Sequence, residues 1–200
     1  WTVIEGNPVN DASGVRCVNA AQSGSVVRGF TLRNGGTAKV DNNIYSGGGI
    51  LNGTAVDCVI TGCRSGNRGG GAFSSTLVRC YLEDCMHGNG TGSAMENGNM
   101  YGCVVKALTH YGSGQVDVNC TYLDGHPTYG AIRGNTSPMH AYNVLLIGSN
   151  KKVSSGYCTF HNSIVTGEID TGAAKPDTAD DDCLIGVGAA GYPYDPVTFR

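Results

Sequence analysis

Charged residues are scarce in this 200-residue chain: Asp, Glu, Lys and Arg together make up 14% of it. The formal net charge is -3 and the lysines and arginines form no run, which excludes the basic surface that binding a nucleic-acid backbone requires. No apolar stretch approaches the roughly 18 residues of a membrane-spanning helix, and no charged-then-apolar signal segment stands at the start. We therefore expect neither a nucleic-acid partner nor a membrane span.

Glycine is what the chain has in excess, with 32 copies. So much glycine and so little charge are unsuited to a helical bundle, because glycine weakens helices and their exposed faces need polar side chains. Strands joined by tight turns fit the composition better. The length suffices for one domain with a sizeable core.

One sequence unit occurs twice in succession, with every aligned pair of positions separated by the same step. Residues 47–63 contain GGGIL and then AVDCVITGC, and residues 69–85 contain GGGAF and then LVRCYLEDC. A fixed period in the twenties, with two short β-like runs and glycine at the corners, is typical of coils that stack and bury each other's apolar edges. Looser copies extend over residues 2–19, 25–34, 92–106, 118–123, 129–146 and 156–165.

Two places interrupt the period. A polar loop at residues 35–46 separates the second coil from the two clear copies. The step from position 103 to position 120, both cysteines, is shorter than the period of the clear copies, so we expect that coil to lack a corner.

Strand side chains alternate between two faces, so the repeat predicts which residues lie inside. In the run at residues 55–63, Val56, Cys58 and Ile60 share one face, and the charged residues of both copies mark the other face as outer. We expect one interior row of thiols, with Gly29 above it and Asn143 interrupting it, and a second row at the next corner formed by Cys63 and Cys85. The first row contains Cys58, Cys80, Cys103, Cys120 and Cys158.

These features resemble the right-handed parallel β-helix superfamily, which has the pectin-lyase-like fold. Within it, the glycine-rich repeats of bacterial surface and secreted proteins related to the polymorphic outer-membrane proteins are most similar. The resemblance rests on GGGI at residues 47–50, GGGA at residues 69–72, and FTLRN at residues 30–34, which is one residue longer than that family's Phe-x-x-Asn motif. It covers residues 2–165 and implies an all-β, right-handed parallel β-helix (solenoid) of about seven coils. Such helices serve adhesins, passenger domains, polysaccharide lyases and glycosidases alike.

The division that follows is a β-helix at residues 1–166 and an irregular C-terminal tail at residues 167–200 that packs on the helix or continues it. The chain opens without methionine on residues 1–6, which have the pattern of a strand interior. This predicts a piece of something longer. Because a stack of coils exposes unpaired strand edges at its ends, we expect another domain or chain to cover the N-terminal coil.

Nine cysteines raise the question of a metal or of disulfides. Stacked coils spread the thiols along an axis, whereas zinc needs four ligands at one point, so we expect no metal. Parallel side chains on adjacent strands make poor bridging geometry, so we expect free, buried thiols in the long row and leave a Cys63–Cys85 bridge open. Asp180, Asp181 and Asp182 are consecutive and give only a weak calcium signal. No cofactor is expected.

Outward-facing residues predict ordinary surface structure. Asp57 lies one coil from Arg79 and Glu83 one coil from Lys106, so each can form an ion pair across neighbouring strands. The outward row is more apolar than a solvated sheet requires, so a partner, the tail after Gly167 or another copy can cover it. This row comprises Val59, Tyr81, Val104, Thr121, Val144 and Thr159.

The corner that follows this sheet is the predicted ligand site. Histidine, tyrosine and cationic residues recur there in successive coils, next to the loop at residues 35–46, and such residues suit an extended glycan with stacking rings and carboxylates. The alternative is that turns are simply polar. The candidate ligand-binding residues are His87, His110, Tyr111, His126, Tyr129, Lys151 and Lys152.

Enzyme motifs are absent from the sequence. It has neither the acidic calcium cluster of pectate lyases nor the Gly-His-Gly motif and carboxylates of polygalacturonases. Lys106, His110 and Tyr111 remain candidates for proton abstraction next to a uronate carboxylate. We therefore expect an extracellular or bacterial cell-surface module for adhesion, carbohydrate binding or structural display, with a polysaccharide or cell-surface glycan as partner. The alternative is a lyase or glycosidase acting on an acidic polysaccharide.

Overall fold

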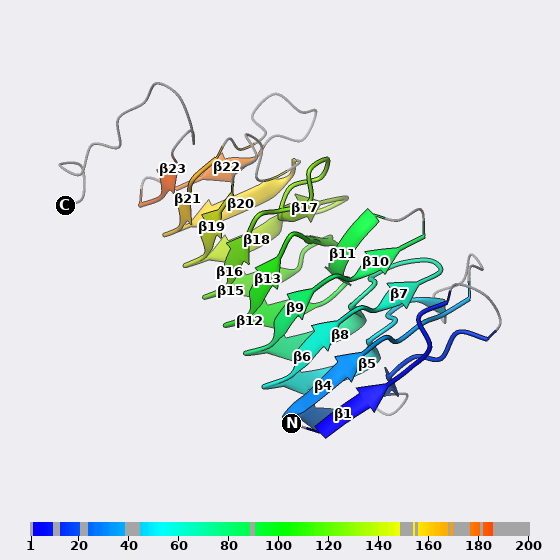
Figure 1. Cartoon of the computed structure of the whole chain (residues 1–200). Coiled ribbons are helices and arrows are strands. Elements are labelled where there is room, and N and C mark those ends of the chain that lie inside the picture. Colours follow the sequence, from blue (N-terminus) through cyan, green and yellow to red (C-terminus); the bar gives the residue numbers. More distant parts are fainter. Residues whose placement is uncertain are drawn as a thin grey trace.

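The described part of the chain is built from β-strands. The computed structural model describes residues 2–9, 13–20, 24–38, 45–88, 91–148, 154, 156–167, 169, 177–180 and 182–185, which contain strands and no α-helix. Among the strand pairs of these residues, only β10 (Met86–His87) and β11 (Thr91–Glu96) run antiparallel. Figure 1 shows the strands stacked side by side, with β1 near one end and β23 near the other. The expected all-β chain with parallel sheets is confirmed.

The first sheet takes one strand from each passage of the chain, in sequence order. Its strands alternate in burial: in β6, Ile60 is fully buried whereas Val59 and Thr61 are half-buried. The inward residues of successive strands stack in register and line the core. The nine strands that the described residues contribute to this sheet are β1 (Thr2–Glu5), β4 (Phe30–Arg33), β6 (Val59–Thr61), β9 (Tyr81–Glu83), β13 (Val104–Lys106), β16 (Thr121–Leu123), β19 (Leu145–Ile147), β21 (Ile164–Val165) and β23 (Leu184–Ile185).

The second sheet contributes its inward residues to the same core. β5 (Ile50–Val56) and β8 (Ala72–Val78) pair along most of their length, and beyond β8 the sheet divides into two branches. One branch comprises β11, β14 (Thr109–Gly112) and β17 (Ile132–Gly134). The other comprises β12 (Asn99–Tyr101), β15 (Val116–Val118), β18 (Met139–Tyr142), β20 (Cys158–His161) and β22 (Thr178–Ala179). β2 (Val18–Asn19) and β3 (Val26–Arg28) pair with the two ends of β5.

The run at residues 55–63 is not one strand. β5 ends at Val56, Asp57 adopts a left-handed conformation with φ 55°, and β6 begins at Val59 in the first sheet. Arg79 and Asn119 have the same conformation at the equivalent place in later coils. The alternation of burial continues through this turn, which is why the residues inside were predicted although the change of sheet was not.

The interior row of thiols is present, but its later members differ from the prediction. Cys158 lies outside the row, because it begins β20 in the second sheet, opposite Met139. The row passes instead through Ser163, the residue before β21. The row starts at Phe30, the first residue of β4, where Gly29 was expected, and it lies one residue before each later strand of the first sheet. These later members are Cys58, Cys80, Cys103, Cys120, Val144 in place of the expected Asn143, Ser163 and Cys183.

All nine cysteines are described and carry free thiols. Cys63 and Cys85, for which a disulfide remained open, are both fully buried and unbridged. The pKa of Cys80 is raised to about 12, first by its hydrogen bond with the Cys103 thiol and also by burial. This thiol is therefore protonated at neutral pH.

The GGG motifs form the corner at which the chain enters the second sheet. Gly47 and Gly69 have positive φ values of 66° and 54°, which disfavour other residues. A Cβ atom on Gly70 would lie 2.3 Å from the carbonyl oxygen of Met86 in the next coil. Close stacking of coils thus requires glycine at this corner for two different reasons.

A short third sheet and the ends of the polar loop lie beside this corner. β7 (Arg64–Ser65) pairs with β10, and β10 pairs with β11. The Thr37 hydroxyl accepts a hydrogen bond from the amide of Gly66, so the loop at residues 35–46 returns to the turn that follows β7. Residues 39–44 of this loop lie outside the described residues.

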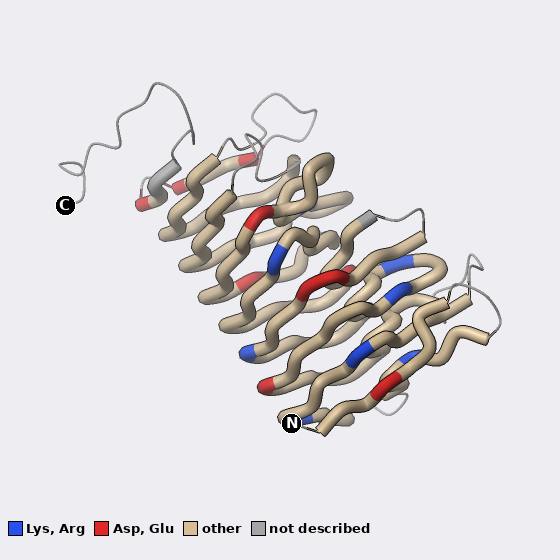
Figure 2. Tube along the Cα trace, viewed as in Figure 1, with Lys and Arg blue, Asp and Glu red and all other residues tan. Residues whose placement is uncertain are grey.

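Charged side chains on the outer surface form the predicted ion pairs. Arg79 donates two hydrogen bonds to the carboxylate of Asp57, at 2.7 and 3.0 Å, and the Lys106 ammonium lies 3.6 Å from Glu83. The outward apolar row continues through Leu145 and Ile164 and not through Val144 and Thr159, because Val144 points inward and Thr159 belongs to the second sheet. Figure 2 shows charged residues scattered over the coils, with no continuous basic stripe along the described trace.

Both ends of the described stack are sheet edges. β1 is the first strand of the first sheet and pairs with β4. β22 and β23 lie beyond the predicted boundary at residue 166 and add a strand to each of the two sheets.

Candidate functional site

A row of outward-facing side chains, polar except for Phe73, crosses the second sheet near the third. Phe73 on β8, Glu96 on β11, Tyr111 on β14 and Arg133 on β17 are aligned by the strand register. Their inward neighbours Ala72, Met95 and Ile132 fill the core, so alternation places these four on the outer side. The parallel pairing thus brings an acid, a phenol and a guanidinium from three coils side by side.

Arg133 joins two tyrosines into one surface. The centre of its guanidinium lies 5.2 Å from the ring centroid of Tyr111 and 4.8 Å from that of Tyr129. Tyr129 in turn stacks on His126, with ring centroids 5.3 Å apart and planes inclined by 21°. We call Tyr111, Arg133, Tyr129 and His126 the stacking surface. All four are partly exposed, as a surface that contacts a ligand must be.

A tight turn holds His126 and Tyr129 in place. The backbone amides and carbonyls of His126 and Gly130 exchange two hydrogen bonds, of 3.0 and 2.8 Å. The His126 Nδ1 atom accepts a hydrogen bond from the amide of Thr128, and its ring lies against Gly92, which has no side chain to displace it. Burial lowers the pKa of His126, so its ring is neutral at physiological pH.

Glu96 lies buried beside the stacking surface. Its Oε1 atom is 3.5 Å from Nη1 of Arg68, in the turn after β7, and its side chain is 4% exposed. Burial raises the pKa of Glu96 to about 7, and the electrostatic influence of Arg68, His110 and Arg133 opposes this shift only in part. The pKa of Tyr111 is also raised, first by burial, while Arg133 lowers it.

His87 borders the same area from β10. Burial lowers its pKa most, and the electrostatic influence of His126 and Arg68 lowers it further, against a backbone hydrogen bond with Asn67 that raises it. His87 thus lies within electrostatic reach of both His126 and Arg68. The structure therefore brings four of the seven predicted ligand-binding residues to one edge: His87, Tyr111, His126 and Tyr129.

His110 is not part of this surface, which corrects its prediction as a ligand-binding and catalytic residue. It is 0% exposed and its ring points into the core, where Nδ1 lies 2.9 and 3.0 Å from the two carboxylate oxygens of Asp117. Tyr122 donates a hydrogen bond to the same carboxylate. His110 and Tyr111 are neighbours in one strand, so alternation sends them to opposite faces, and a ligand outside the sheet reaches only Tyr111.

The other predicted residues lie elsewhere. Lys106 is on the outer face of the first sheet, paired with Glu83, and not on the strands that carry Tyr111 and Arg133. Lys151 and Lys152 lie outside the described residues.

Sequence reasoning did not select Glu96 or Arg133 as site residues. Both could have been assigned to the outer face, since each directly follows an inward apolar residue in a strand of the repeat. No sequence signal indicates that Glu96 is buried despite facing outward, because side chains and turns from other coils cover it.

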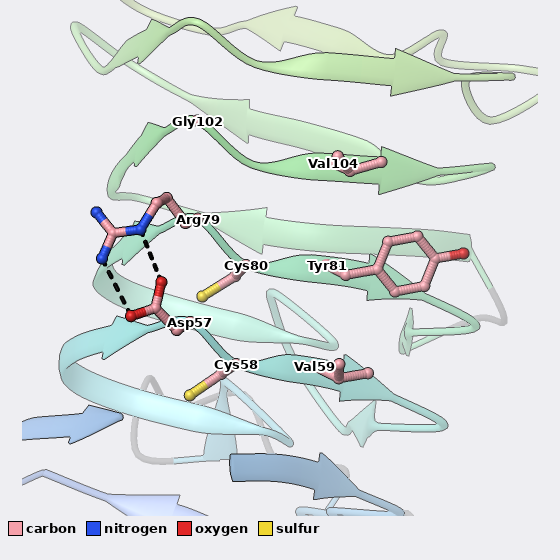
Figure 3. A pocket seen from close by; sticks show the side chains of 8 residues that line it. All are labelled: Asp57, Cys58, Val59, Arg79, Cys80, Tyr81, Gly102 and Val104. Atoms are coloured by element: carbon pink, nitrogen blue, oxygen red, sulfur yellow. Dashed lines mark hydrogen bonds and ion pairs between the residues drawn. The ribbon is translucent and has the colours of Figure 1, made fainter. Parts of the chain in front are cut away.

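Apart from the stacking surface, a hollow lies where the chain passes from the second sheet into the first. It has a volume of about 310 Å³, and Figure 3 shows Val59, Tyr81 and Val104 on one side of successive strands, with the Asp57–Arg79 pair at the turn. Gly102, which has no side chain, lies above Arg79 at this turn. The two charges satisfy each other and are exposed, so this hollow lacks a buried polar group aimed at a ligand.

Within the described ranges, no cluster of three or more His, Cys, Asp or Glu side chains is arranged to hold a metal ion. The same part of the chain contains no helix with the length and apolar character to cross a membrane. The chain matches no protein-family model, no curated protein and no solved structure at a significant level.

Proposed function

We propose that the chain is a right-handed parallel β-helix, a solenoid of stacked coils, that binds a carboxylate-bearing polysaccharide on the stacking surface. The solenoid is supported by parallel pairing that sets one clear copy of the repeat in register on the next in both sheets. The bacterial surface proteins with glycine-rich repeats remain the family it resembles. A place outside the cell or on its surface, and a further domain or chain covering β1, belong to the same proposal.

The observation that carries the proposed binding is the guanidinium of Arg133 between Tyr111 and Tyr129. Sugar rings pack on aromatic faces and edges, and a guanidinium pairs with a carboxylate through two parallel hydrogen bonds. Arg68, with 47% of its side chain exposed, adds a second cation nearby. Two arginines beside two tyrosines and a histidine suit an acidic glycan better than a neutral one.

Hexagalacturonate binding measured by calorimetry tests the proposal. Arg133→Gln and Tyr129→Ala should each weaken binding by about 3- to 10-fold, since single ionic or stacking contacts contribute modestly at exposed sites. Arg79→Gln and Tyr101→Ala are the matched controls, because both change exposed residues away from the stacking surface and should leave the affinity unchanged. Binding should also weaken between about 0.05 M and about 0.5 M salt. Equal effects in variants and controls would contradict the assignment of the surface.

Cleavage of the same polysaccharide is a second candidate function, favoured by the pKa of about 7 of Glu96 beside Tyr111. A carboxyl group with this pKa gains and loses a proton near neutral pH, as general acid–base catalysis requires. In β-elimination a base takes the proton from C5 of a uronate, the C4–O bond breaks, a C4=C5 double bond forms and the departing oxygen takes up a proton; here the Glu96 carboxylate would be the base and the Tyr111 hydroxyl the proton donor. Incubation with polygalacturonate should then produce ultraviolet absorbance that is lost in Glu96→Gln and Tyr111→Phe, and no absorbance would remove this candidate.

A further inference from the structure

The ion pair beside the stacking surface joins two residues of very different exposure. The side chain of Arg68 is 47% exposed, whereas that of Glu96 is 4% exposed, and their closest atoms lie 3.5 Å apart. Glu96 therefore lies on the protein side of Arg68, while much of the guanidinium stays open to solvent. Any carboxylate that approaches Arg68 from solvent meets a cation already paired with an internal anion.

We propose that Glu96 competes with the ligand's carboxylate for Arg68, so that protonation of Glu96 switches the surface to its tight-binding state. This inference rests on the proposed binding of an acidic polysaccharide. With Glu96 ionised, Arg68 is partly neutralised and a second carboxylate is repelled. With Glu96 protonated, the site gains one net positive charge and Arg68 pairs with the ligand.

The groups that face Glu96 come from every neighbouring element. Arg68 approaches it from the turn after β7, Tyr111 adjoins it on β14, and Arg133 lies one strand further on β17. His110, on the core side of β14, also acts on Glu96 electrostatically. Within the described residues, Arg68, His110 and Arg133 lower the pKa of Glu96, yet burial outweighs them and leaves it near 7. The switch therefore operates in the physiological pH range.

The direction of the effect follows from the charge of Glu96. Affinity for a uronate ligand should rise as the pH falls through about 7, because the carboxylate that competes for Arg68 is removed. Two other groups gain charge at lower pH, His87 and His126, but burial lowers the pKa of both. Both histidines therefore gain charge only toward the acid end of the pH range. Substituting them separates their effect on affinity from that of Glu96.

Calorimetric titration with hexagalacturonate at about pH 5.5 and about pH 8.5 tests the switch, since the ligand's carboxylates stay ionised over this range. Wild-type affinity should be about tenfold higher at the lower pH, because protonation removes the one negative charge of Glu96 near the ligand. Glu96→Gln, which mimics the protonated acid, should bind at the higher pH as wild type does at the lower. Asp57→Asn is the matched control: it removes the same charge from an exposed Asp–Arg pair and should preserve the pH dependence. His87→Gln and His126→Gln should retain most of it.

Arg68→Gln provides an independent variant in case Glu96→Gln does not fold, which circular dichroism would reveal. It should reduce the gain at low pH, because the cation for which the two carboxylates compete is gone and only the repulsion between Glu96 and the ligand remains. Wild-type binding that does not change with pH, or an undiminished pH dependence in Glu96→Gln or Arg68→Gln, would overturn the switch while leaving the binding function intact. Absence of wild-type binding at both pH values would instead overturn the proposed function on which the switch depends.

Discussion

Two neighbouring regions of the core are built from opposite chemistry. In the regular coils at residues 47–85, the inward positions of both sheets carry apolar side chains and thiols, all of them buried. In the short coil that follows Cys103, equivalent positions carry His110, Asp117 and Tyr122, which are just as buried and bond to one another.

The strands pair in parallel in both regions, with one shift of register between Ser93 and Met95 in the pairing of β11 with β14. His110 pairs with Met95, Asp117 with Met100, and Tyr122 with Val105, so each polar residue takes the place of an apolar one in the preceding coil. Stacking of parallel strands therefore depends on backbone pairing and side-chain volume, and it accepts polar residues that hydrogen-bond to one another. The match is incomplete, because the buried Nε2 atom of His110 has no hydrogen-bond partner among the described residues. The comparison also shows why His110 is unavailable to a ligand.

The largest expected effect comes from breaking the polar cluster. Asp117→Ala should lower the free energy of unfolding by about 3–5 kcal/mol, because it leaves His110 and Tyr122 buried without their common partner. Urea unfolding followed by circular dichroism measures the change. The triple variant His110→Met, Asp117→Leu, Tyr122→Phe should lose far less, since it restores the apolar chemistry of the regular coils. A triple variant as unstable as Asp117→Ala would show that the cluster itself is required for stability.

An intermediate effect is expected at the glycine corners. Gly70→Ala, in a regular coil, should lower the free energy of unfolding by about 3 kcal/mol, because its Cβ would lie 2.3 Å from the carbonyl oxygen of Met86. The two coils cannot move apart without breaking the hydrogen bonds between their strands. Gly114→Ala, in the short coil, should cost about 1 kcal/mol, the penalty of a left-handed φ of 72° where the nearest atom is 3.8 Å away. The same unfolding assay compares the two, and equal losses would mean that tight stacking is not confined to the regular coils.

The smallest effect is expected for the surface pair of the regular coils. Asp57→Asn, Arg79→Gln and the double variant should differ little in stability, because both side chains are largely exposed and water screens their charges. A double-mutant cycle in low and high salt measures the coupling. A coupling as large as the loss in Asp117→Ala would contradict the view that this region is stabilised by its core and not by its charges.

Much of the candidate site followed from the repeat, and part of it did not. The shared edge of His87, Tyr111, His126 and Tyr129 was predictable because each recurs after a strand of the repeat, at a corner where parallel coils bring such positions together. Arg133 was within reach of the same reasoning. Lys106 was assigned from its chemistry without regard to its sheet, and it lies on the other one.

The sequence alone determined the all-β architecture, the parallel stacking, the inward thiols of the regular coils and the Asp57–Arg79 pair. All of these depend on the fixed period of the repeat and on the alternation of side chains along a strand, which are local and periodic properties. The tertiary structure decided that His110 points inward, because the phase of alternation in β14 depends on its register with β11, where an irregularity lies between Ser93 and Met95. It also decided that Glu96 is buried, because the groups that cover an outward carboxyl come from other coils and turns, whose approach no period in the sequence encodes.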